Sequence, residues 1–294
     1  MVKNDKCFQT VSNIIMLFLC LLVVAPLLLL VMSSFTSESA IYQYGYNFWP
    51  KEFDLSAYQY LFREGSIFHS YLITIVVTLT GTVAGVLMTT LLAYALTVPE
   101  LPGKGLITLY VLLTMLFSGG LVPSYMMWTK MFHIKNTLWA LILPGLLCNG
   151  FNVMIARSYF VTNIPKELLE SARVDGMTEF KIFAKIVIPI SVPIVATLGF
   201  MQALYYWNDW QNSLYYITDS SLVGIQALLN NLLNDAQYLA KASALAGGSA
   251  TTSSIPSMST RMAIAVLGML PMVCAYPFFQ KYYVKGLTIG AVKG

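Results

Sequence analysis

The segment Glu170-Ser-Ala-Arg-Val-Asp-Gly176, followed after nine residues by Ile186-Val-Ile-Pro189, decides how this sequence is interpreted. The first segment is polar and is composed mostly of residues that suit a helix. Long apolar runs precede it and follow it. A chain that crosses a membrane repeatedly needs such polar connections between its apolar segments. We therefore expect this stretch to be a short helix at a membrane surface.

The composition indicates that lipid is the main solvent of this chain. Of its 294 residues, 57% are hydrophobic and only 10% are charged, whereas a soluble domain carries about 25% charged residues. The net charge of +4 is too small to indicate nucleic acid as a partner. A mild basic excess is typical of the cytoplasmic connections of membrane proteins. The four cysteines have no metal-like spacing, so no metal site is predicted.

Apolar segments long enough to cross a membrane predict an all-α, polytopic membrane protein with six transmembrane helices. The segments are Ile14–Met32, Phe68–Leu96, Leu106–Trp128, Leu138–Phe160, Ile186–Trp207 and Met262–Tyr282. They must be helical because hydrocarbon cannot satisfy exposed peptide groups, and the prolines within them are expected to bend them. Gly81, Ala84 and Gly85 form a small-residue face on the second helix, which would let another helix approach closely.

The distribution of basic residues predicts the orientation of the chain. Eleven of the 17 Lys and Arg residues fall on the side of the N-terminus, which places both termini in the cytoplasm. The first apolar segment is longer than the core of a usual signal peptide, so a retained helix is favoured over a cleaved one. We expect one transmembrane domain over residues 1–294, with a long extracytoplasmic loop at about 208–261.

The polar segment carries the signals of a short, bounded helix at about residues 165–178. Asn163 could cap it, Pro165 suits its first helical position, and Gly176 supplies the break that a left-handed cap needs. A second helix is expected to start near Thr178 and to run into the fifth span. Such a short surface helix could transmit a movement of a soluble partner to two membrane helices. The alternative is an amphipathic helix that lies on the lipid headgroups.

The same residues resemble the coupling motif of ATP-binding-cassette (ABC) importer permeases. The family pattern is Glu-Ala-Ala, three residues, Gly, nine residues, then Ile-x-Leu-Pro; here Ser171 and Ile188 replace the first Ala and the Leu. The C-terminal residues 285–294 resemble the ending of carbohydrate importer permeases of the maltose-permease type. Residues 118–123 and 136–145 resemble the subgroup of lipoprotein-linked permeases, which includes importers of alginate and pectin oligosaccharides.

The resemblance implies a type I ABC importer permease fold in a bacterial cell membrane, and a transport subunit rather than an enzyme. It implies uptake of carbohydrate, as oligosaccharides derived from a polysaccharide, by alternating access. The implied partners are a second homologous permease, two cytoplasmic ATPase subunits that bind ATP and Mg, and an extracytoplasmic solute-binding protein. This chain would bind no cofactor, and it lacks a phosphate-binding loop. The coupling residues would be Glu170, Ser171, Ala172, Arg173, Asp175 and Gly176.

Polar and aromatic residues within the apolar segments are candidates for the substrate pathway, because polar groups in a membrane face protein or water. They are Asn149, Asn152, Gln202, Tyr205, Tyr206, Trp207, Asn208 and Asp209. Hydrogen bonding between helices is the alternative for the two asparagines that interrupt the fourth helix. An interfacial aromatic belt is the alternative for the second group, at the end of the fifth helix.

The sequence also bears on functions other than sugar import. A receptor-like structural protein is disfavoured because no soluble sensor domain is evident. An intramembrane enzyme would need a buried acid, nucleophile or metal cluster within the spans, and the sequence offers no such pattern. A permease for a non-sugar solute shares the coupling motif. The Lys-Gly ending and the long outer segment before the sixth span favour sugar over that alternative.

Overall fold

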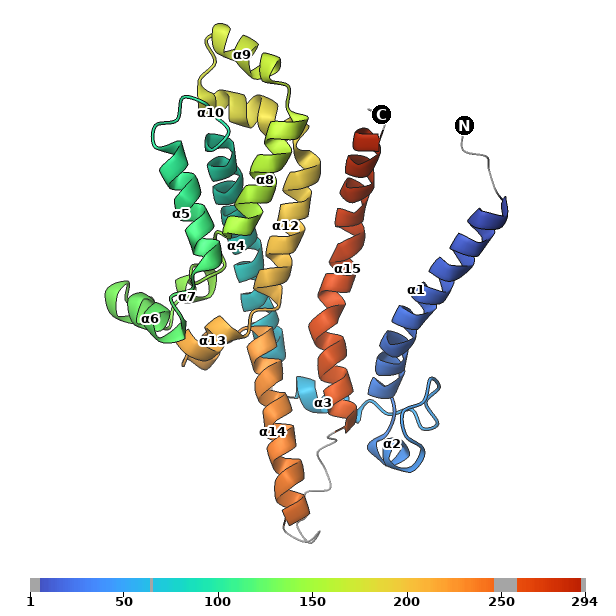
Figure 1. The fold of residues 1–294 in the computed structure, drawn as a ribbon. Helices are drawn as coiled ribbons and strands as arrows, with labels where there is room; N and C mark the ends of the chain where they lie inside the picture. Colours follow the sequence, from blue (N-terminus) through green and yellow to red (C-terminus); the bar gives the residue numbers. More distant parts are fainter. Residues whose placement is uncertain (1–5, 64–65, 246–257, 292–294) are drawn as a thin grey trace. The chain divides into compact units, whose positions relative to one another are not determined.

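The computed structural model describes residues 6–63, 66–245 and 258–291, and these are helical over most of their length (Figure 1). Within these ranges the only extended pairing is an isolated antiparallel bridge between Thr36 and Phe53. The predicted all-α class is therefore confirmed. The chain forms two compact units, residues 1–67 with 229–271 and residues 68–228 with 272–294.

The first unit contains the N-terminal span and short helices that follow it. They are α1 (Lys6–Ser34), α2 (Glu38–Tyr44) and α3 (Ser56–Phe62), together with most of α14 (Ile225–Leu245) and the start of α15 (Met258–Ala291). The Glu38 carboxylate accepts hydrogen bonds from the backbone N–H groups of Met258 and Ser259, at 3.0 and 3.1 Å. A carboxylate suits these unpaired donors at a helix start, so Glu38 fixes where α15 begins relative to α2.

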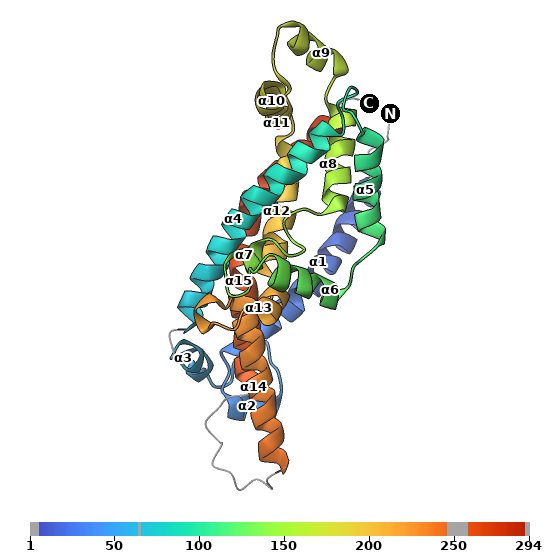
Figure 2. The same cartoon turned by 90° about the vertical axis from the view of Figure 1, so that its left-hand side faces the viewer.

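The second unit is a helical bundle that carries the polar segment. Its elements are α4 (Ser66–Ala95), α5 (Lys104–Leu116), α6 (Leu121–Met126), the π-helix η1 (Met127–Met131), α7 (Trp139–Ile142), α8 (Gly150–Asn163), α9 (Lys166–Val174), α10 (Glu179–Ile182), the π-helix η2 (Phe183–Val187), α11 (Ile188–Ile190), α12 (Val192–Trp207), α13 (Gln211–Tyr216) and the 3₁₀ turn η3 (Ser220–Leu222). α4, α5, α8 and α12 run alongside one another in both views (Figures 1 and 2).

Three of the described helices are long and apolar enough to cross a membrane by themselves, within Phe8–Ser34, Ser66–Ala95 and Met258–Gln280. Two bent pairs raise this number to five: Lys104–Leu116 with Leu121–Met131, at 117°, and Glu179–Ile190 with Val192–Trp207, at 86°. The predicted spans Leu106–Trp128 and Ile186–Trp207 are therefore not continuous helices. The structure does not establish the predicted number of six.

Each of the two bends has a local cause in the sequence. The first follows an extended Phe117 and ends at Gly120, whose φ of +79° is a conformation that glycine adopts without strain. The second falls at Ser191, between Pro189 and Pro193. Proline lacks a backbone N–H and its ring crowds the preceding turn, so two of them four residues apart bend the helix strongly.

The predicted fourth span, Leu138–Phe160, is also interrupted. α7 ends at Ile142, residues 143–149 are non-helical, and α8 starts at Gly150. Pro144 cannot donate to the helix, and Gly145 is left-handed with φ +71°. Asn149 caps α8, because its side chain accepts a hydrogen bond from the N–H of Phe151 at 2.9 Å. The sequence predicts the interruption at Asn149 and Asn152, which lie a few residues after the Pro144–Gly145 pair that causes it.

The segment 208–261, expected as a long extracytoplasmic loop, contains regular structure. It includes α13, η3, α14 and the first turn of α15, while residues 246–257 lie outside the described part. Asn136 organises the start of this segment, because its Oδ1 accepts a hydrogen bond from the N–H of Thr218 at 2.6 Å. The buried hydroxyl of Thr74 accepts from the N–H of Ile225 at 2.8 Å and so fixes the start of α14.

The small-residue face of α4 is confirmed as a site of close approach by α12. A Cβ atom at Gly81 would lie within 3.0 Å of three atoms of the Tyr206 ring. One at Gly85 would lie within 3.0 Å of the Gln202 amide nitrogen and of the Leu147 carbonyl oxygen. These two glycines therefore admit the side chains of α12 and the backbone that precedes α8.

We predict that Gly81→Ala lowers the free energy of unfolding of the detergent-purified transporter by about 1–3 kcal/mol, and with it the melting temperature. The methyl group would overlap the ring of Tyr206, which is itself buried. Gly199→Ala in α12 is the matched control, because a Cβ there meets no atom within 4 Å. Equal melting temperatures for the two variants would contradict the packing described here.

Candidate coupling site

The polar segment is anchored to the bundle by a buried apolar cluster. Ala172 of α9, Ile182 of α10 and Phe183 of η2 pack with residues from the end of α4 and from α8 and α12. All three are less than 5% exposed. α9 consequently lies at one end of the bundle, past the ends of α4, α5 and α8 (Figures 1 and 2).

The start of α9 differs from the expected arrangement. Pro165 precedes the helix with ψ 132°, and is not its first helical residue; α9 begins at Lys166. Asn163 does not cap α9 but ends α8, where its side chain donates to the Tyr159 carbonyl at 3.0 Å. The reason is Ile164, which adopts an extended conformation because the residue before a proline is disfavoured in the helical region.

The end of α9 confirms the expected left-handed break at Gly176, where φ is +77°. The Gly176 N–H donates to the Arg173 carbonyl, and the Met177 N–H donates to the Ala172 carbonyl, both at 3.0 Å. These two bonds form a Schellman motif, which commonly ends a helix at a glycine. Met177 and Ala172 belong to the same apolar cluster, as the motif favours. The motif turns the chain sharply from α9 into α10.

A charged hydrogen-bond network connects α9, α10 and α4. The Arg173 Nε donates to Glu179 Oε1 at 2.7 Å, and the Tyr94 hydroxyl donates to Glu179 Oε2 at 2.6 Å. The Tyr94 ring packs against Phe183 with centroids 5.6 Å apart. The bond from Arg173, followed by that from Tyr94, holds the pKa of Glu179 below its usual value. Glu179 and Tyr94 were not predicted from the sequence, because Tyr94 lies 85 residues before its partner.

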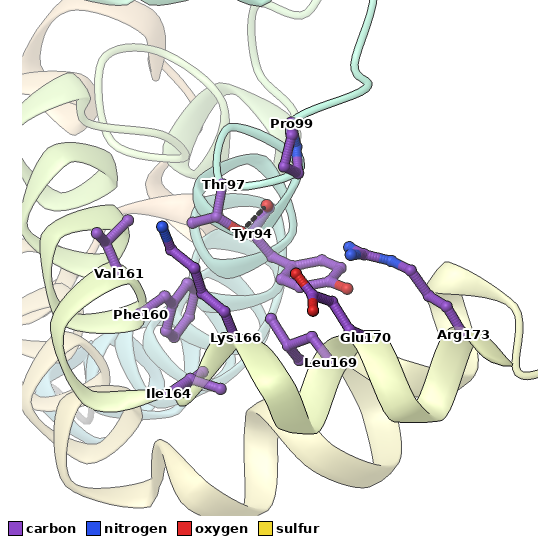
Figure 3. Close-up of a pocket in the computed structure, with 10 residues that line it drawn as sticks. All are labelled: Tyr94, Thr97, Pro99, Phe160, Val161, Ile164, Lys166, Leu169, Glu170 and Arg173. Carbon is purple, nitrogen blue, oxygen red and sulfur yellow. Dashed lines mark hydrogen bonds between the residues drawn. The ribbon is translucent and has the colours of Figure 1, made fainter. Parts of the chain in front are cut away.

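A small hollow of about 80 Å³ lies between α9, α8 and the end of α4. It is lined by Tyr94, Thr97, Pro99, Phe160, Val161, Ile164, Lys166, Leu169, Glu170 and Arg173 (Figure 3). Figure 3 shows the Glu170 and Arg173 side chains reaching from α9 toward Tyr94. Ser171, Val174 and Asp175 are exposed beyond this hollow, and Val174 is 87% exposed. An exposed apolar side chain on a polar helix was not singled out from the sequence.

The eight candidate substrate-pathway residues divide by accessibility and do not share one exposed surface. Asn152, Gln202, Tyr206 and Trp207 are buried, while Asn149, Tyr205 and Asn208 are exposed. The Tyr206 hydroxyl and the Gln202 amide donate to backbone carbonyls. Asp209 accepts from the N–H groups of Gln211 and Asn212 at the start of α13, and burial raises its pKa above the usual value.

The geometry of a membrane bundle with a projecting polar helix agrees with comparisons to known proteins. The profile of the family described as binding-protein-dependent transport system inner membrane component matches residues 3–289. The chain belongs to this family. This permease is therefore a multi-pass membrane component of an ABC-type transport system, a family whose members depend on a separate binding protein.

Relatives match the permease along almost its whole length. It is 35% identical to protein LplC of Bacillus subtilis over 92% of this chain and 90% of LplC. It is 34% identical to the polygalacturonan/rhamnogalacturonan transport system permease protein YtcP of the same species, over 99% and 100% of the two chains. A solved chain of a bacterial ABC transporter for import of the acidic polysaccharide alginate superposes with a TM-score of 0.78, at 26% identity, over 96% of this permease and 99% of that chain.

We predict that Gly176→Val uncouples ATP hydrolysis from transport in this permease while it still inserts in the membrane. No atom lies within 4 Å of the added Cβ, so the cost is backbone strain alone. A β-branched residue at this φ costs on the order of 1–2 kcal/mol. Gly176→Asn is the control, because asparagine tolerates the left-handed region. Normal solute-stimulated ATPase activity in the valine variant would refute a role of the Gly176 turn in coupling.

Proposed function

We propose that this chain is the permease subunit of an importer that takes up oligosaccharides released from a polysaccharide. The observation that carries the proposal is the near full-length similarity to permeases named for such solutes. Besides YtcP and the alginate transporter, these include the arabinooligosaccharides transport system permease protein AraQ of Halalkalibacterium halodurans, 29% identical over 94% of each chain. None of these names points to a non-sugar solute.

The proposed assembly contains a second homologous permease, two cytoplasmic ATPase subunits and an extracytoplasmic solute-binding protein. ATP and Mg are bound by the ATPase subunits, and α9 fits a groove on one of them. The exposed residues Glu170, Ser171, Val174 and Asp175 are available for that contact. The buried face of α9 supports the role, because Ala172 and the Arg173–Glu179–Tyr94 network transmit a displacement of the helix to α10 and α4.

The proposed topology places α9 and both termini in the cytoplasm and treats residues 1–294 as one transmembrane domain. The excess of basic residues on that side supports the orientation. Lys166, Lys181 and Lys185 surround the coupling segment, and all three are exposed. Basic side chains near the membrane are favoured on the cytoplasmic face, which carries negative lipid charge.

The reconstituted complex, with its own partner subunits, should test the solute class. We expect ATPase activity to rise several-fold with the binding protein and oligosaccharides from pectin or alginate, and not with amino acids or polyamines. Polysaccharides that have not been degraded serve as a control for length. Stimulation by an amino acid or polyamine, without any response to oligosaccharides, would overturn the proposal.

Glu170→Lys should weaken docking of the ATPase more than it weakens folding. Glu170 is exposed and lines the hollow with two cations, Lys166 and Arg173, so a lysine there gathers three positive charges (Figure 3). Unpaired charge at a docked surface typically costs several kcal/mol. Co-purification of the ATPase with the permease measures the effect, and Glu167→Lys on the same exposed helix is the control. Retention of ATPase at wild-type stoichiometry would instead indicate a helix that only lies on the headgroups.

A further inference from the structure

The non-helical residues 143–149 lie within the length that the chain needs to cross a membrane. α8 contains 14 residues and rises about 21 Å at 1.5 Å per residue, less than the roughly 30 Å of a hydrocarbon core. For α8 to complete the predicted fourth span, the segment before it has to cover part of the depth. Irregular backbone is tolerated there only when it is buried in protein or lines a water-filled cavity.

Three side chains satisfy alternate carbonyl groups at the start of this segment. The Tyr206 hydroxyl donates to the Ile142 carbonyl at 2.9 Å, and the Asn212 amide donates to the Pro144 carbonyl at 3.1 Å. The Gln202 amide donates to the Leu146 carbonyl. The three carbonyls at positions 142, 144 and 146 point to donors on α12 and α13. We call these three donors the carbonyl clamp.

The carbonyl clamp is itself held rigidly. Gln202 and Tyr206 are 2% exposed and Asn212 is 9% exposed. Gln202 and Tyr206 are one helical turn apart on α12 and rest on Gly85 and Gly81 of α4, where any side chain would displace them. α7, α12 and α13 meet in the second unit (Figure 2). Buried donors of this kind are costly unless paired, so they restrict the segment to one position.

The far end of the segment is left accessible. Cys148 and Asn149 are exposed, directly after the carbonyls that the clamp holds. Asn152, three residues further along α8, is 1% exposed, and its Oδ1 accepts no hydrogen bond from any described residue. Discontinuous helices in secondary transporters commonly place unwound backbone beside the solute. The start of the segment is thus held by hydrogen bonds to its carbonyl groups. Its end is exposed, and it is followed by a buried amide oxygen for which no described residue is a donor.

We propose that Gln202, Tyr206 and Asn212 are positioning residues, which hold residues 143–149 as an unwound segment whose Cys148–Asn149 edge borders the transported solute. The contact with solute rests on the function proposed above, whereas the positioning does not. This assigns to Gln202 and Tyr206 a role that differs from direct solute binding, because their donors are already occupied by the backbone. Asn149 stays a candidate for direct contact.

Cys148 provides a native reporter of this arrangement. In the assembled transporter with Cys7, Cys20 and Cys274 replaced by serine, Cys148 is the remaining thiol of this chain. The rate of its labelling by a small polar maleimide is measured for Tyr206→Phe and Gln202→Leu, which each remove one donor. Tyr215→Phe is the matched control, because it removes a hydroxyl from the same unit for which no described residue is a partner.

We expect Tyr206→Phe and Gln202→Leu each to change the labelling rate roughly threefold to tenfold, as the loss of a hydrogen bond allows, and Tyr215→Phe to leave it unchanged. Oligosaccharide, binding protein and ATP together should slow labelling in the wild-type background. Unchanged labelling in both clamp variants, with the complex intact by size-exclusion chromatography, would overturn the positioning role.

The proposed contact with solute is overturned if an oligosaccharide that the wild-type complex transports does not slow the labelling of Cys148. If the complex transports no oligosaccharide, the function proposed above fails instead. The comparison of labelling rates without solute still decides the role of the carbonyl clamp in that case.

Discussion

The need of every peptide group for a hydrogen-bond partner away from water constrains this permease more than any other interaction. Continuous helices meet the need within themselves, as α4 does over 30 residues. Each interruption exposes donors and acceptors that must be paired from elsewhere. Tyr206, Gln202 and Asn212 donate hydrogen bonds to carbonyl groups at the interruption before α8. At the start of α14, the Thr74 hydroxyl accepts one from the N–H of Ile225. These polar side chains therefore complete the hydrogen bonding of the backbone where the helices are interrupted.

The same principle shapes the coupling segment, although there water is at hand. Its two ends are an extended Ile164–Pro165 entry and a Schellman exit at Gly176, and both fix the direction of the chain. Glu179 then connects α9 to α4 through one carboxylate that accepts from both Arg173 and Tyr94. Because both donors favour the ionised form, Glu179 stays charged at neutral pH.

Local rules allowed the sequence to predict some features well. Glycine at Gly176 predicted a left-handed break, and the Gly81–Gly85 face predicted close approach by another helix; both are confirmed. The all-α class and the apolar segments followed from composition and length. The function of the coupling residues was inferred from a motif, and it stays a proposal.

Contacts between residues far apart in the sequence could not be predicted. Nothing local indicates that Tyr94 meets Glu179, or that Gln202 serves the carbonyl of Leu146, 56 residues away. Apolar run length also hides interruptions, because a broken span has the same composition as a continuous one. The pair Pro189 and Pro193 was expected to bend the fifth span, and it does. Pro144-Gly145 was a visible signal as well, yet prolines in membrane helices often cause only bends and not a seven-residue interruption.

The bend at Ser191 sets the direction in which a displacement could pass from the coupling segment to α12. The helical run Glu179–Ile190 meets α12 at 86°, close to a right angle. A displacement along the first axis has almost no component along the second, so it cannot push α12 end-on through the membrane. Under the coupling role proposed above, such a displacement would instead move the near end of α12 sideways and tilt the helix. A right-angled joint would in this way convert a small stroke along the first helix into a rotation of the second.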